Sequence, residues 1–147
     1  MLNLQILLKY FPEKIAIYGL IIILSLILLM HVMVFVGLLP YEMVWGGRLK
    51  TKSDMVIFEA ISLFINALML SIVLIRAGIL KIKVNILLLK LAFWVMVAIY
   101  SLNTLGNLAS LNTFERLFFS PLTLILAIFS WRLTIFEETK SNTQPIK

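Results

Sequence analysis

Four long runs of apolar residues, separated by short polar segments, divide the chain. The runs cover residues 15–39, 55–75, 84–105 and 117–136. About 20 apolar residues in a helix cross the hydrocarbon core of a bilayer, so each run is long enough to span a membrane. The pattern therefore predicts an all-α fold, a polytopic membrane protein built as a four-transmembrane-helix bundle.

The start of the fourth span has two interpretations. Asn112 followed by Glu115 has the spacing of a helix-capping box, which would place Pro121 inside the helix as a kink. Ser120 followed by Pro121 instead resembles a cap and a first-turn proline. We favour the first interpretation, because it lets Glu115 and Arg116 begin the helix.

The composition supports a membrane protein. Of the 147 residues, 62% are hydrophobic and 14% are charged, whereas soluble domains are about half apolar and about a quarter charged. The chain has too few polar residues to surround a water-soluble core. We expect residues 1–138 to form a single four-span domain and residues 139–147 to form a disordered cytoplasmic tail.

The distribution of basic residues predicts the orientation of the bundle. Four spans place both termini on one side, and nine of the 13 Lys and Arg residues lie on that side. The positive-inside rule then places the N- and C-termini in the cytoplasm, and we expect the plasma membrane as the location. The basic residues sit at the ends of the apolar runs, so they anchor the spans and no nucleic-acid partner is expected.

Several kinds of chemistry are excluded by residues that the chain lacks. It has no cysteine and one histidine, His31, so thiolate metal sites, redox cysteine pairs and multi-histidine metal or haem sites are ruled out. Gly46 and Gly47 are not followed by the Lys-Ser/Thr of a phosphate-binding loop. We expect no metal site and no cofactor.

Polar residues within the spans concentrate in the half of the bundle away from the termini. Glu59 and Asn66 lie seven residues apart, close to one face of a helix. Tyr100, Asn103 and Asn107 are spaced by three and four residues, which also places them on one face. The first outer loop adds an acid, a base and an aromatic ring. The candidate ligand-binding residues are His31, Glu42, Trp45, Arg48, Glu59, Asn66, Tyr100, Asn103, Asn107, Glu115 and Arg116.

The predicted depths of these residues suggest a cup that is open outward or sideways. At about 1.5 Å per helical residue, Glu59 lies roughly 6 Å below the outer helix ends, His31 roughly 12 Å and Asn66 roughly 16 Å. The inner half is almost wholly aliphatic apart from its terminal basic residues, which argues against a continuous polar pore. Each polar group also has a structural interpretation. Glu59 could pair with Arg48 or Arg116, His31 could be a packing residue, and the asparagines could hold helices together.

Three functions fit this arrangement. The first is binding, or transport, of a small or lipid-like molecule in the polar cup. The second is an intramembrane enzyme that uses Glu59, together with His31, as general acid or base. The third is an accessory subunit of a larger membrane complex. We expect membrane lipid and a small amphiphilic ligand as partners, with an oligomer or a partner subunit as further options.

Overall fold

The computed structural model describes residues 11–41, 51–110 and 112–135, with only the backbone of Glu115. Within these residues the regular structure is entirely helical, without strands. The helices are α2 (Glu13–Phe35), α3 (Lys52–Arg76), α4 (Ile86–Leu108), the short π-helical segment η3 (Glu115–Phe119) and α5 (Ser120–Thr134).

Four helices are long and apolar enough to cross a membrane, the fourth consisting of α5 together with most of η3. Large apolar side chains are exposed along all four, where a bilayer can cover them. The predicted all-α, four-helix membrane bundle is confirmed, and the apolar helices indicate an integral membrane protein.

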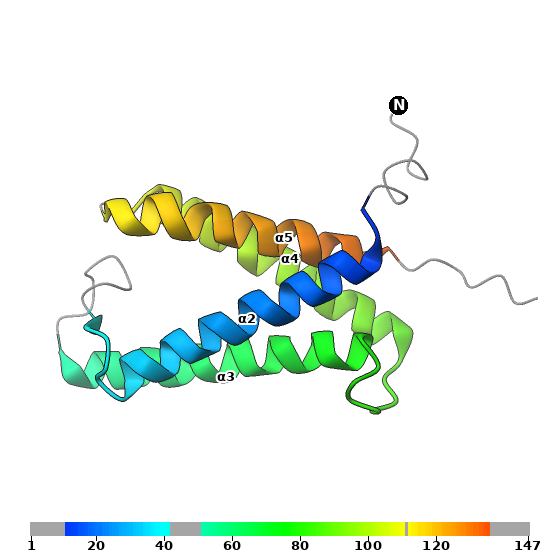
Figure 1. Ribbon diagram of the computed structural model, residues 1–147, viewed down its shortest axis with the longest axis horizontal. Helices are drawn as coiled ribbons and strands as arrows, with labels where there is room; N and C mark the ends of the chain where they lie inside the picture. Colours follow the sequence, from blue (N-terminus) through cyan, green and yellow to red (C-terminus); the bar gives the residue numbers. More distant parts are fainter. Residues whose placement is uncertain (1–10, 42–50, 111, 136–147) are drawn as a thin grey trace, which may run out of the picture.

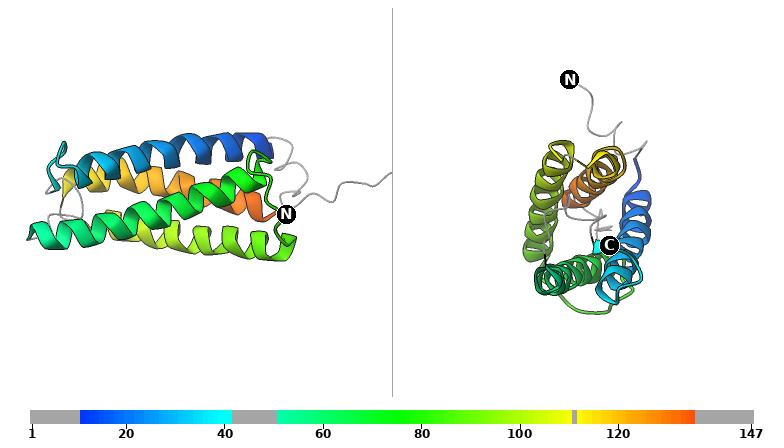
Figure 2. Two further views of the ribbon diagram at one scale, coloured as in Figure 1. Left: turned by 90° about the horizontal axis from the view of Figure 1, so that it is seen from below. Right: turned by 90° about the vertical axis from the view of Figure 1, so that its left-hand side faces the viewer.

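The helices form two antiparallel pairs, α2 with α3 and α4 with α5 (Figure 1). The start of α2 and the end of α5 lie at one end of the bundle, which we call the terminus end. There, α2 lies beside α5, whereas at the opposite end α2 lies beside α3 and α4 lies beside α5. The two pairs therefore separate towards the opposite end, as Figure 1 shows, and Figure 2 views the four helices from that end.

The terminus half of the bundle holds most of the apolar core. Side chains from all four helices meet there. Helices α3 and α4 contact each other less than each contacts its own pair partner. The fully buried members of this core include Leu20, Leu24, Val73, Phe93 and Leu133. Between helices in lipid, close packing of this kind supplies much of the association energy, because hydrocarbon outside is as apolar as the core.

Helix α2 ends earlier than the apolar run that predicted it. Gly37 adopts a left-handed conformation, with φ of 79°. Its N–H donates to the carbonyl of Val34, and the N–H of Leu38 donates to the carbonyl of Met33. These two bonds form a Schellman motif, which satisfies the last carbonyls of the helix and stops it at Phe35. The apolar residues up to position 39 therefore belong to a connection and not to the span.

Helix α3 begins three residues before its apolar run. The Thr51 side chain accepts a hydrogen bond from the backbone N–H of Asp54 at 3.1 Å, so Thr51 is the N-cap. The helix ends at Arg76 with a second Schellman motif, in which Gly78 has φ of 73°. Local capping chemistry, and not the length of the apolar run, sets these ends.

The fourth span begins as the first interpretation of its sequence predicted. The Asn112 side chain accepts a hydrogen bond from the N–H of Phe114 at 2.9 Å, and helical structure follows directly from Thr113. Instead of a simple proline kink, the chain passes through the π-helical turn η3 just before Pro121. A π-turn changes the register of the helix, so α5 presents a different face to the bundle than a continuous α-helix would.

Polar contacts link neighbouring chain segments at the terminus end of the bundle. Arg132 is only 1% exposed, and its Nε donates to the backbone carbonyl of Phe11 at 2.7 Å. At the same end, Arg76 pairs with Glu13. From the sequence we expected Arg132 to be one of the basic residues at the membrane interface. In the structure its side chain is instead buried in the bundle.

Candidate functional site

A pocket of about 320 Å³ lies in the half of the bundle opposite the termini. All four helices and the η3 turn contribute to its wall, so the pocket occupies the space where the α2–α3 pair separates from the α4–α5 pair. Five of the predicted candidate residues line it. They are His31, Asn66, Tyr100, Asn103 and Asn107.

The remaining candidates lie elsewhere. Glu59 is fully buried next to the pocket without lining it. Arg116 is exposed on η3 and does not line it. Glu42, Trp45, Arg48 and the side chain of Glu115 are outside the described residues, so the predicted contribution of the first outer loop remains a prediction.

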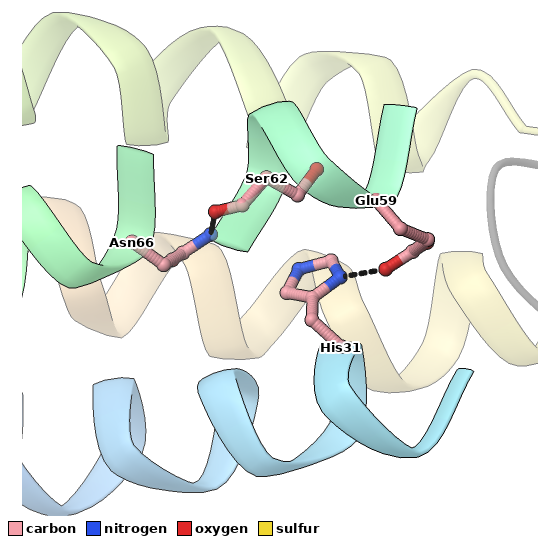
Figure 3. A network of polar contacts seen from close by, with 4 residues as sticks. All are labelled: His31, Glu59, Ser62 and Asn66. Atoms are coloured by element: carbon pink, nitrogen blue, oxygen red, sulfur yellow. Dashed lines mark hydrogen bonds and ion pairs between the residues drawn. The ribbon is translucent and has the colours of Figure 1, made fainter. Parts of the chain in front are cut away.

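A short hydrogen bond joins His31 of α2 to Glu59 of α3 (Figure 3). The distance between His31 Nδ1 and Glu59 Oε2 is 2.6 Å. The Glu59 side chain is 0% exposed and that of His31 is 12% exposed. Glu59 is therefore paired with His31. From the sequence we considered these two residues together as general acid or base, but considered Arg48 or Arg116 as the ion-pair partner of Glu59.

This contact corrects the predicted difference in depth between the two residues. The sequence placed His31 about 6 Å deeper than Glu59, counting from position 39. Because α2 ends at Phe35 and α3 begins at Lys52, the depth of His31 decreases by about 6 Å and the depth of Glu59 increases by about 4.5 Å on the same scale. Counted from the helix ends, His31 then lies about 6 Å and Glu59 about 10.5 Å deep, so the predicted order of depth is reversed. The two side chains bridge the remaining difference of about 4.5 Å.

The second ring nitrogen of His31 faces Ser62 and Asn66 (Figure 3). Within the described part of the chain, this Nε2 forms no hydrogen bond. Asn66 donates from Nδ2 to the backbone carbonyl of Ser62 at 2.9 Å, and its amide oxygen forms no hydrogen bond with the described residues. One wall of the pocket therefore carries the imidazole of His31 and the side-chain amide of Asn66.

The opposite wall carries polar groups that contact neighbouring helices. Tyr100 donates its hydroxyl to Met69 Sδ at 3.0 Å. Thr104 lies 2.9 Å from Thr123, oxygen to oxygen, and ties α4 to α5. The Nδ2 of Asn107 lies 3.5 Å from the Thr123 hydroxyl, a long contact. The two contacts with Thr123 join α4 to α5, and the Tyr100–Met69 contact joins α4 to α3.

Asn103 differs from the other polar lining residues, because its side chain is exposed and forms no hydrogen bond with the described residues. Leu102 and Gly106, on the same side of α4, also line the pocket while remaining exposed. A Cβ added at Gly106 would meet no atom within 4 Å. The pocket therefore opens to the outside of the bundle along this part of α4.

Sequence reasoning missed the contribution of η3 and α5 to the site. Thr123 and Phe119 line the pocket, but neither was a candidate. A signal was present in the sequence. Small residues recur at intervals of three and four along the buried face of α5, which lets another helix approach closely. They are Ser120, Thr123, Ala127, Ser130 and Thr134.

The site can donate and accept hydrogen bonds, and the His31–Glu59 pair can hold or release a proton. No group of three or more His, Cys, Asp or Glu residues suited to a metal ion occurs among the residues that the structure describes. Comparisons of the chain with family models, with curated proteins and with solved structures found no match.

Proposed function

We propose that this protein binds, and carries, a small amphiphilic molecule whose polar part occupies the pocket. The supporting observation is the pocket itself, which has a volume of about 320 Å³ and is lined by polar side chains between apolar helices. Uncommitted polar groups are costly at hydrocarbon depth, so a ligand that hydrogen-bonds to them gains free energy that lipid chains cannot supply.

The charge asymmetry of the chain supports an orientation for this site. Nine of the 13 basic residues belong to the side of the termini, which the positive-inside rule assigns to the cytoplasm. In a plasma membrane the pocket would then lie in the outer half of the bilayer. A ligand would reach it from the outer leaflet or from the outer surface.

Native mass spectrometry of the gently purified protein tests this proposal. We expect a co-purified small amphiphile that is lost in Asn66→Leu, because leucine removes the amide from the pocket wall. Ser101→Leu is the matched control, since Ser101 is an exposed polar residue of α4 that does not line the pocket. A stable protein partner without any bound ligand would contradict the proposal and favour an accessory subunit.

One observation favours a second candidate, an intramembrane acid–base catalyst. A buried carboxyl bonded to an imidazole at 2.6 Å, with the imidazole facing a pocket, is an arrangement that can transfer a proton to a bound molecule. The test is to follow the co-purified ligand over time by mass spectrometry. Catalysis requires a change of its mass or isomeric form with the unaltered protein and none with Glu59→Gln, while the ligand still binds.

A further inference from the structure

We infer that the pocket selects an uncharged, hydrogen-bonding head, of the kind rich in hydroxyl or amide groups, carried on an apolar tail. This inference rests on the proposed binding function and adds the chemical class of the ligand. It follows from three observations. The described lining residues carry no fixed charge, several hydrogen-bonding groups have no partner among the described residues, and the pocket opens along α4.

The lining residues that the structure describes contain no Lys, Arg, Asp or Glu. An anionic head such as a phosphate, once removed from water, needs a cation or several N–H donors to repay its desolvation. Arg116, the basic candidate on η3, is exposed and does not line the pocket. The described wall therefore lacks a counter-charge for an anion.

The His31–Glu59 pair does not change this conclusion. If His31 takes up a proton and becomes cationic, the Glu59 carboxylate 2.6 Å away balances the added charge. A cationic head would need direct contact with a carboxylate, but Glu59 is 0% exposed and His31 stands between it and the pocket. The pocket meets an imidazole nitrogen, which exchanges hydrogen bonds with neutral groups.

The uncommitted polar groups match a neutral head with both donors and acceptors. Asn66 offers its amide oxygen, because its Nδ2 already donates to Ser62. The whole Asn103 amide is uncommitted among the described residues, and His31 adds its Nε2. Hydroxyl and amide groups on a ligand can donate to these oxygens and accept from the Asn103 N–H bonds.

The apolar lining and the opening indicate where a tail would lie. Met30, Leu122 and Leu126 line the pocket beside the polar groups. The opening lies along the exposed face of α4 that carries Leu102 and Gly106. A volume of 320 Å³ is near the lower limit of ligand pockets, about 300–1,000 Å³. It therefore accommodates a head and the first carbons of a chain, with the rest of the tail in the bilayer.

Three photoreactive probes with one common tail separate the alternatives. We would use an alkyl glucoside, an alkyl phosphate and an alkyl trimethylammonium, each with the same diazirine-bearing eight-carbon chain. The full-length protein is held in phosphatidylcholine nanodiscs, and labelled peptides are identified by mass spectrometry. We expect the glucoside to label residues around the pocket about tenfold more than either charged probe, the effect of about two net hydrogen bonds.

Two variants on α4 show whether the labelling comes from the pocket. Gly106→Leu places a large side chain at the opening, and its Cβ meets no atom within 4 Å, so the fold should remain intact. Ala98→Leu enlarges an exposed residue of the same helix that does not line the pocket. Glucoside labelling should fall about tenfold in Gly106→Leu, as expected when the head is excluded, and should be unchanged in Ala98→Leu.

The outcomes distinguish this inference from the proposed function. Stronger labelling by the phosphate or the ammonium probe, lost in Gly106→Leu, would overturn the neutral-head inference and leave the binding function standing. Labelling by all probes that is unchanged in Gly106→Leu would mean that the tails react from bulk lipid, which overturns both. Glucoside labelling that depends on the open pocket supports both.

Discussion

His31 and Glu59 place a titratable pair within a membrane-spanning bundle. The carboxyl is fully buried, and the 2.6 Å contact between Nδ1 and Oε2 leaves one proton between the two atoms. Charged groups at this depth are expensive unless they are paired, so the histidine also supports the fold by holding α2 against α3. These two residues therefore stabilise the contact between α2 and α3 and also supply the acid–base groups of the candidate site.

Removing one member of the pair should cost more stability than removing both. We expect His31→Leu to lower the free energy of unfolding by about 3 kcal/mol, because the buried carboxyl loses its imidazole partner. In the double variant with Glu59→Leu, most of that loss should be recovered, since two apolar side chains replace a polar contact. Thermal unfolding of the two single variants and the double variant in one detergent measures the coupling, and additive losses would contradict it.

At the scale of elements, helix ends decided which predicted residues meet. The apolar runs predicted the existence, number and approximate extent of the spans, because a bilayer demands about 20 apolar residues. They could not show that Gly37 would end α2 at Phe35 or that Thr51 would start α3. Those shifts of a few residues bring His31 within reach of Glu59, so the relative depth predicted from run lengths was wrong for this pair.

The ring of Phe129 on α5 packs directly against Gly19 of α2. A Cβ at this position would lie 2.1 Å from Cε2 of Phe129, whose ring also lies near Phe11 with centroids 5.7 Å apart. The absence of a side chain at Gly19 therefore allows one of the contacts between the two helix pairs at the terminus end.

Gly19→Ala should separate these helices and lower the free energy of unfolding by about 1–3 kcal/mol through overpacking. Gly106→Ala is the control, because its Cβ meets open space and alanine favours a helix over glycine by about 1 kcal/mol. Shortening the neighbour, as in Gly19→Ala with Phe129→Leu, should restore part of the loss. Equal thermal midpoints for Gly19→Ala and the unaltered protein would show that the ring moves aside freely.

At the scale of the whole molecule, the pocket results from two helix pairs that separate at one end. The spacing of Tyr100, Asn103 and Asn107 predicted a shared face, and all three line one pocket with Asn66 and His31. Spacing within one helix cannot reveal which face of α5 meets α4, because η3 changes the register before Pro121. Thr123 and the enclosed Arg132 were missed for this reason: their surroundings come from other helices.

The orientation of the whole molecule is open to a direct test, since the chain has no cysteine and any introduced thiol is the sole reactive one. Ser53→Cys and Thr113→Cys place exposed thiols at the end of the bundle opposite the termini, and Ile82→Cys places one at the terminus end. If the termini are cytoplasmic, a membrane-impermeant maleimide should label the first two in intact cells and the third only after lysis. The opposite pattern would invert the orientation and move the pocket to the inner leaflet. Unequal labelling of Ser53→Cys and Thr113→Cys would contradict the four-span fold, because both connections should emerge on one side of the membrane.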